Sequence, residues 1–93
     1  MSRLWIICYD IADDSVRREV DKLLRRRGER IQWSVFECFL SIEQLIEARA
    51  RLRTLIDPST DSLRYYPLCA WCQERVKWHG QGRRSDDPAA WII

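Results

Sequence analysis

The stretch RIQWSVFECFL, residues 30–40, decides the fold. Apolar and aromatic side chains dominate it, as is typical of β-structure, and no Gly or Pro marks a turn inside it. Eleven residues are nevertheless long for a single strand. We therefore predict a break or tight turn near Ser34, which makes two consecutive strands in the middle of the chain.

A strand and a helix are predicted before this stretch. Residues 4–9 form a continuous apolar run that ends at Asp10, and this pattern fits a buried strand. Residues 12–15 include the Asp and Ser side chains that typically cap the start of a helix, and apolar side chains then recur at helical spacing. Three arginines followed by Gly28 indicate where this helix ends.

A second helix and further strands are predicted after it. Ser41 and Gln44 have the spacing of a capping box at a helix start. The sequence Asp-Pro-Ser-Thr at residues 57–60 then ends this helix. Residues 62–69 are a strand candidate, and residues 75–79 are a short fifth one.

This order of elements predicts an α+β, ferredoxin-like βαββαβ sandwich, in which both helices cover one face of an antiparallel sheet. The other face stays open and suits a dimer surface or a ligand platform. The chain has 93 residues and reads as one domain, which we place at residues 1–80. Residues 81–93 form a C-terminal extension, and its apolar end would pair as a short strand with the partner subunit of a homodimer.

No apolar run is long enough for a transmembrane helix, so we expect no membrane contact. The N-terminal apolar run is also too short for a signal-peptide core, and this favours a cytoplasmic protein.

Basic residues are concentrated in the middle of the chain. Residues 15–53 carry ten basic and six acidic side chains, net +4, and 14 of the 16 basic residues in the chain are Arg. Arg offers a planar fork that matches phosphate, so this region suits nucleic acid. The alternative is a solvated helix face with local pairs such as Arg17–Asp21. The candidate nucleic-acid contacts on or after the first helix are Arg17, Arg18, Lys22, Arg25, Arg26, Arg27 and Arg30.

Asp10 is the most specific single candidate for a metal-binding or catalytic residue. It follows a buried strand, and a carboxylate at that position can hold Mg²⁺, which typically takes one or two carboxylates and waters. The alternative is an Asp that caps the loop or the next helix, as Asp13 and Asp14 are expected to do. A twofold dimer could bring a second copy of Asp10 to the same place, where the metal would polarise a phosphoryl oxygen or activate water.

Cys69 and Cys72 have the spacing of a metal knuckle or a redox pair. A redox pair would normally open a helix, whereas residues 73–79 look extended. We therefore favour burial or incidental spacing for this pair. A zinc site would need two further ligands, and the only other soft candidates are Cys8, Cys38 and His79.

From residue 4 to about residue 80 the chain resembles the CRISPR-associated protein 2 family. The resemblance rests on an ordered set of segments rather than on any single one. These are Tyr9–Asp10–Ile11, Asp13–Asp14 with the Arg-rich segment after it, Arg30 to Cys38, and Asp61 to Cys69 with Cys72. Residues 81–93 contain no motif that we can align.

The resemblance implies a ferredoxin-like homodimer that joins the CRISPR integrase, CRISPR-associated protein 1, to capture and insert spacer DNA. Some members of the family are Mg²⁺-dependent endonucleases on single-stranded RNA or double-stranded DNA. Their Asp after the first strand binds the metal, and this role carries to Asp10. The basic residues from Arg17 to Arg30 would contact the nucleic-acid backbone, and Tyr9, Ser34 and Phe36 would shape the site or the dimer seam.

Several functions remain open at this point. In the first, the protein is a hydrolase in which Asp10 from each subunit holds Mg²⁺, and we lean towards this reading. In the second, it is a non-catalytic DNA-binding scaffold that spaces two integrase units. The third is a toxin-type ribonuclease of related fold with no CRISPR role.

Overall fold

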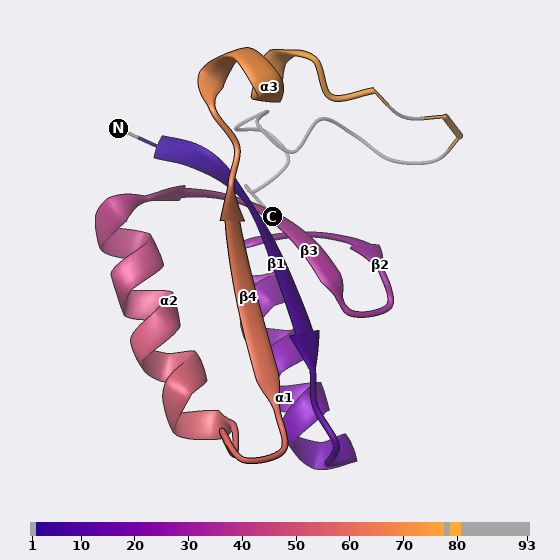
Figure 1. The fold of residues 1–93 in the computed structure, drawn as a ribbon, viewed down its shortest axis with the longest axis vertical. Helices are drawn as coiled ribbons and strands as arrows, with labels where there is room; N and C mark the ends of the chain where they lie inside the picture. The colour runs from indigo at the N-terminus through magenta and orange to yellow at the C-terminus, as the bar shows by residue number, and fades with distance from the viewer. Residues whose placement is uncertain (1, 78, 81–93) are drawn as a thin grey trace.

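The computed structural model describes residues 2–77, 79 and 80, and it shows an α+β architecture (Figure 1). The described residues form four strands and three helices; the order up to β4 is the predicted one, and the third helix was not predicted. The elements are β1 (Ser2–Asp10), α1 (Asp14–Arg25), β2 (Gly28–Gln32), β3 (Val35–Ser41), α2 (Ile42–Leu55), β4 (Ser62–Pro67) and α3 (Ala70–Glu74).

The strands form one antiparallel sheet in the order β2-β3-β1-β4. Helix α1 passes behind β1 and β4, α2 runs beside β4, and α3 lies beyond one end of the sheet (Figure 1). The hydrophobic core fills the space between the sheet and the two long helices. This strand order, with both helices on one face, confirms the predicted ferredoxin-like sandwich.

A turn at Trp33 and Ser34 separates β2 from β3, as predicted. Gln32 before the turn pairs with Val35 after it. The register shifts between Arg30 and Gln32, so the pairing of β2 with β3 is irregular. The carbonyl of Ser34 accepts a hydrogen bond of 3.1 Å from the backbone amide of Tyr9. This bond joins the turn to the end of β1, where Asp10 follows.

Local capping chemistry fixes the start of both long helices. The Asp13 side chain accepts bonds of 2.8 Å from the Ser15 amide and 3.1 Å from the Val16 amide at the start of α1. At α2 the Ser41 hydroxyl accepts from the Gln44 amide, and the Gln44 side chain accepts from the Ser41 amide. Both capping predictions are confirmed.

Gly28 differs from its predicted role as the residue that stops α1. The helix ends at Arg25 with Arg26 as its cap, and Gly28 is already the first residue of β2. A Cβ at Gly28 would lie 2.2 Å from the carbonyl oxygen of Glu37. Glycine is therefore required by the close approach of β2 to β3 rather than by the end of the helix.

The predicted strands near the C-terminus are partly wrong. Strand β4 ends at Pro67 rather than at Cys69, and residues 70–74 form the helix α3. Residues 75–77 are not strand, which contradicts the described part of the predicted fifth strand. The predicted extension at residues 81–93 lies outside the described residues.

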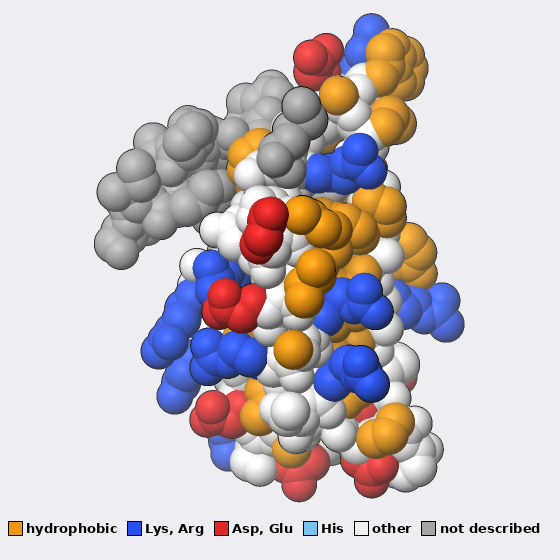
Figure 2. All heavy atoms as spheres, turned by 90° about the vertical axis from the view of Figure 1, so that its left-hand side faces the viewer, with side chains coloured by type: hydrophobic (Ala, Val, Ile, Leu, Met, Phe, Trp, Pro, Cys, Tyr) orange, Lys and Arg blue, Asp and Glu red, His pale blue; other side chains and the backbone are white. Residues whose placement is uncertain are grey.

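The core consists mainly of aliphatic side chains from β1, β3 and the two long helices. Its largest fully buried side chains are Phe36, Ile7, Leu24, Leu40, Leu52, Val20 and Cys38. On α2, however, Ile42 and Ile46 are 55% and 59% exposed. Figure 2 shows hydrophobic side chains on the face that presents α2, with Lys and Arg side chains on both sides of them.

Within the described ranges, no helix combines the length and the apolar character that crossing a membrane requires.

Candidate metal and nucleic-acid site

Asp10 lies at the C-terminal end of β1, opposite Ser62 of β4. Side chains alternate along a strand, and Tyr9 points into the core, so Asp10 belongs to the sheet face that the long helices leave uncovered. The Asp10 residue is exposed, and no described side chain pairs with its carboxylate. Asp10 is therefore not a helix cap, because Asp13 and Ser41 take those positions.

Arg64 is a cation on this open face that the sequence-based prediction missed. It pairs across the strands with Cys8, two residues before Asp10, so it lies diagonally across from the carboxylate. Its guanidinium donates to the Tyr66 hydroxyl at 3.4 Å and is otherwise exposed. The register of β1 with β4 reveals this placement, and the sequence alone does not contain that register.

The donor set in one copy of the chain is small. Within the described residues, no three His, Cys, Asp or Glu side chains come together as a metal site. Asp10 supplies one hard, exposed carboxylate, which fits Mg²⁺ if waters, a phosphate or a second copy of the chain supply the other ligands. Asp10 alone therefore supplies one ligand, and the rest of such a site would come from outside the described residues of this chain.

The predicted basic residues do not form one free patch. Five of the seven make ion pairs with acidic side chains of the same chain. These pairs are Arg17–Asp14, Lys22–Glu19 (3.8 Å), Arg25–Asp21 (2.6 Å), Arg27–Glu47 (3.1 Å) and Arg30–Asp21 (3.5 Å). Only Arg18 and Arg26 of the set form no ion pair with another described residue.

Asp21 forms ion pairs with two of these residues, Arg25 and Arg30, at the β2 edge of the sheet. The Arg17–Asp21 pair, which served as the example of the local-pairing alternative, does not form, because Arg17 pairs with Asp14 and donates to the Ile11 carbonyl at 3.1 Å. Asp21 instead accepts from Arg25 and lies beside Arg30, whose guanidinium also stacks over Trp33 at 5.3 Å. Arg30 sits in the strand after the helix, so helical spacing alone gave no signal for this contact.

Tyr9 lies against the same group. Burial raises the pKa of the Tyr9 phenol, and the Asp21 carboxylate raises it further, so the hydroxyl stays protonated. It donates to the Trp33 carbonyl at 3.4 Å. Tyr9 therefore connects the strand that carries Asp10 to the turn between β2 and β3, and its site-shaping role stays a prediction.

Ser34 and Phe36 act at different places. Ser34 is in the turn and accepts the Tyr9 amide, as described above. Phe36 is fully buried on the helix side of the sheet and stacks with Tyr9 at 6.3 Å between ring centroids. It therefore supports Tyr9 from the core, and it does not reach the open face where a dimer seam would form.

The Cys69 and Cys72 pair was expected to lie in extended chain, and this is wrong. Cys69 is the N-cap of α3, and its sulfur accepts from the Cys72 amide at 3.3 Å. That hydrogen bond and a second one from the Cys72 thiol lower the pKa of Cys69. Both residues are exposed, so burial, one of the two explanations that we favoured for this pair, is wrong, and incidental spacing remains a prediction. Cys38, in contrast, is buried.

Comparison with known proteins identifies the family. The family model for CRISPR associated protein Cas2 matches residues 2–76. A protein of Synechocystis named CRISPR-associated endoribonuclease Cas2 3 is 39% identical over 90 residues, which covers 97% of this chain and 98% of that relative.

Solved structures agree with this result. The crystal structure of Streptococcus pyogenes Cas2 is 34% identical, with a TM-score of 0.73, and the match covers 83% of this chain and 99% of that one. A chain from a structure described as a partial Cas6-RT-Cas1–Cas2 complex is 25% identical, with a TM-score of 0.68, and the match covers 81% and 82% of the two chains. The family match extends over β1 to β4, including the strand end at Asp10 and the whole basic segment. The chain therefore belongs to the CRISPR-associated protein Cas2 family.

Proposed function

We propose that this chain is a homodimeric nucleic-acid-binding protein that joins the CRISPR integrase in spacer acquisition, and that Asp10 gives it Mg²⁺-dependent endonuclease activity. The observation that carries the proposal is the exposed Asp10 carboxylate, which has no described partner on a sheet face that the long helices leave uncovered. The similar Synechocystis protein is named an endoribonuclease, and a similar chain occurs in a structure that also contains Cas1.

The uncovered sheet face supports the homodimer. Ile6, Val35 and Phe39 lie on it and are only half-buried, while Tyr66 is 46% exposed. A second copy packed on this face would bury these apolar groups, and the gain is about 25 cal/mol for each Å² removed from water. Two sheets packed in this way would also bring both copies of Asp10 to the same interface.

Asp10 would hold the metal in such a site, with the second copy of Asp10 as a further ligand. Bound Mg²⁺ polarises a phosphoryl oxygen and lowers the pKa of a coordinated water. Arg64 lies on the same face and would bind a phosphate oxygen of the substrate, which positions the backbone beside the two carboxylates. Tyr9 and the turn at Ser34 would hold the end of β1 in place.

The basic residues of α1 and β2 would bind the backbone of duplex DNA, and of RNA if the protein cleaves it. Arg18 and Arg26 are free to do so. Arg17, Lys22, Arg25, Arg27 and Arg30 would have to exchange an acidic partner for a phosphate. Each phosphate contact releases counterions. The logarithm of the binding constant should therefore fall linearly with the logarithm of the salt concentration.

The proposed catalytic role of Asp10 is tested with the variant Asp10→Asn. Its cleavage of single-stranded RNA and of duplex DNA is measured in Mg²⁺ and compared with that of the wild type. We expect the variant to lose cleavage while it keeps its fold, because the Asp10 carboxylate contacts no described residue. Glu43→Gln is the matched control, since it removes the same charge from an exposed position at the start of α2. It should cleave like the wild type, and EDTA should stop both.

Cleavage by Asp10→Asn at the wild-type rate would remove Asp10 from catalysis. The second candidate is a scaffold without catalysis, and the observation that favours it is that the described residues of one chain form no cluster of three or more His, Cys, Asp or Glu side chains that could hold a metal ion. In that case Asp10→Asn should support integration by the partner integrase as well as the wild type does. RNA cleavage without any effect on integration would instead favour a toxin-type ribonuclease.

A further inference from the structure

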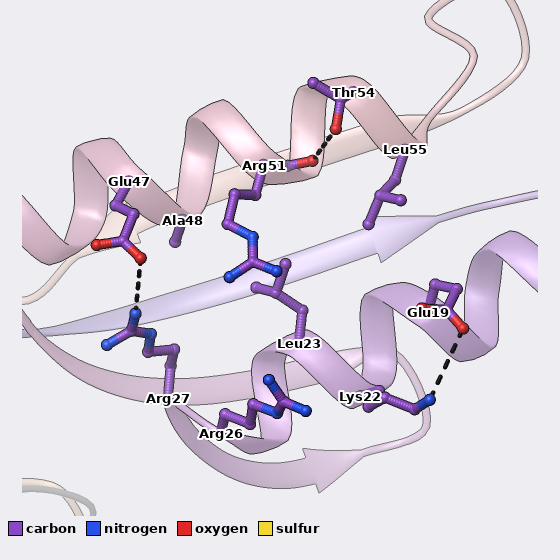
Figure 3. Close-up of a pocket in the computed structure, with 10 residues that line it drawn as sticks. All are labelled: Glu19, Lys22, Leu23, Arg26, Arg27, Glu47, Ala48, Arg51, Thr54 and Leu55. Atoms are coloured by element: carbon purple, nitrogen blue, oxygen red, sulfur yellow. Dashed lines mark hydrogen bonds and ion pairs between the residues drawn. The ribbon is translucent and has the colours of Figure 1, made fainter.

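A groove separates α1 from α2 on the helical layer of the protein (Figure 3). Its volume is about 540 Å³, which is within the size range of small-ligand sites. Its lining comes from the two helices and the turn after α1, and none of it comes from the sheet. Ala48 is buried and Leu23 and Leu55 are half-buried, so apolar groups line its deeper part.

Two of the four cations in the groove are paired and two are free. Lys22 lies 3.8 Å from Glu19 on the same helix, and Arg27 donates to Glu47 across the groove at 3.1 Å. The other two cations are Arg26 from the end of α1 and Arg51 from α2. Neither forms an ion pair with a described residue, so the groove carries an excess positive charge.

The two free guanidinium groups approach the same space from opposite sides. Figure 3 shows Arg51 reaching from α2 towards α1, and Arg26 reaching into the space beside it. An anion in this space would interact favourably with both positive charges. Guanidinium groups bind phosphate oxygens in a bidentate manner, which makes phosphate the best-matched anion.

We propose that the α1–α2 groove is a second backbone-binding site, in which Arg26 and Arg51 together hold a phosphodiester of a nucleic acid. It lies on the helical layer, on the opposite side of the sheet from Asp10, and Arg51 gives α2 a direct role in binding. The inference rests on the proposed nucleic-acid-binding function and adds a location and a residue to it.

The test measures binding of a fluorescein-labelled DNA duplex by anisotropy, in EDTA and across a salt series. We expect Arg51→Gln and Arg26→Gln each to weaken binding about 3- to 10-fold and to lower the salt slope by about 1. Arg53→Gln is the matched control. It removes the same charge two residues further along α2, and Arg53 does not line the groove. The positive charge of Arg53 instead acts to lower the pKa of Tyr65, against the rise that burial causes.

Each outcome decides between distinct conclusions. Weakening by Arg51→Gln but not by Arg53→Gln supports the groove, and partial recovery in Arg51→Lys supports a guanidinium-specific contact. Equal weakening by Arg51→Gln and Arg53→Gln shows that only total charge matters, and overturns the inference. Binding unchanged by Arg51→Gln and Arg26→Gln overturns it too, while leaving the proposed function standing. A wild-type protein that binds no duplex refutes the proposed function itself.

A competition arm identifies the source of the phosphate. A mononucleotide at the same phosphate concentration should displace the labelled duplex far less than unlabelled duplex does, because only a continuous backbone also reaches contacts outside the groove. Displacement as strong as that by the unlabelled duplex would assign the groove to a free nucleotide, and would overturn the inference. Thermal melts of all variants check that the fold is retained.

Discussion

Replacing Gly28 with Ala should destabilise the protein by pushing β2 away from β3. The new Cβ would lie 2.2 Å from the Glu37 carbonyl oxygen, 2.5 Å from the Cys38 sulfur and 2.9 Å from the Cys38 Cα. Ordinary contact begins at 3.4 Å, so β2 would have to move by about 1.2 Å to clear the backbone oxygen alone. A shift of that size stretches a ladder hydrogen bond of about 2.9 Å beyond its useful range.

The cost follows from these distances. Overpacking of this kind costs about 1–3 kcal/mol, and one lost backbone hydrogen bond adds about 1 kcal/mol. We therefore expect Gly28→Ala to lower the free energy of unfolding by about 3 kcal/mol. For a domain of this size that corresponds to a fall in Tm of about 12–24 °C. Urea and thermal unfolding at fixed protein concentration measure it, because a dimer links stability to concentration.

The double variant Gly28→Ala/Cys38→Ala shows which clash dominates. Removing the sulfur relieves the contact at 2.5 Å but leaves the backbone oxygen at 2.2 Å. The double variant should therefore remain much less stable than Cys38→Ala. If it were as stable as Cys38→Ala, the sulfur alone would be the obstacle, and the reasoning about strand spacing would be refuted. An unchanged Tm for Gly28→Ala would refute it outright.

Three further predictions concern thiols, a helix cap and acid stability. Hydrogen bonds lower the pKa of Cys69, whereas burial raises the pKa of Cys38 to about 12. Iodoacetamide at pH 7.5 should therefore modify Cys69 first and Cys38 only after unfolding, and mass spectrometry that found equal rates in the native protein would contradict this. Ser41→Ala removes the hydroxyl that accepts from the Gln44 amide, whereas the Ser41 backbone amide can still donate to the Gln44 side chain. The loss of this cap should lower the free energy of unfolding by about 1 kcal/mol, and an unchanged urea midpoint would argue against it. Backbone amides lower the pKa of Asp61 below its ordinary 3.8, so its stabilisation is complete above that value and lost as the pH falls through the lower folded pKa. Asp61→Asn should accordingly lower Tm at pH 7 and have little effect at pH 2, and an equal loss at both would show that the charge is not involved.

Features set by neighbouring residues could be predicted from the sequence. Asp13 and Ser41 cap the helices because their side chains reach amides only two or three residues ahead. The break near Ser34 followed from strand length, and the fold class followed from the order of elements. Asp10 could be placed at a strand end for the same reason, since the strand is a continuous apolar run.

Features that depend on residues distant in the sequence could not be predicted. Whether Asp21 pairs with Arg17 or with Arg30 depends on how closely β2 approaches α1, and periodicity carries no information on that distance. The role of Gly28 likewise depends on the backbone of a neighbouring strand. Ile42 and Ile46 are apolar residues of α2, yet both are exposed, so residue type alone does not show which side of the helix the core covers.

The irregular register of β2 makes the two borders of the sheet unequal. The shift between Arg30 and Gln32 interrupts the row of backbone donors and acceptors that an incoming strand would use, and so discourages extension there. The border formed by β4 keeps a regular pairing with β1 along its length. A sheet that accepts a foreign strand on one border only can be completed once and then grows no further. Pairing through that border alone would favour closed assemblies over fibres.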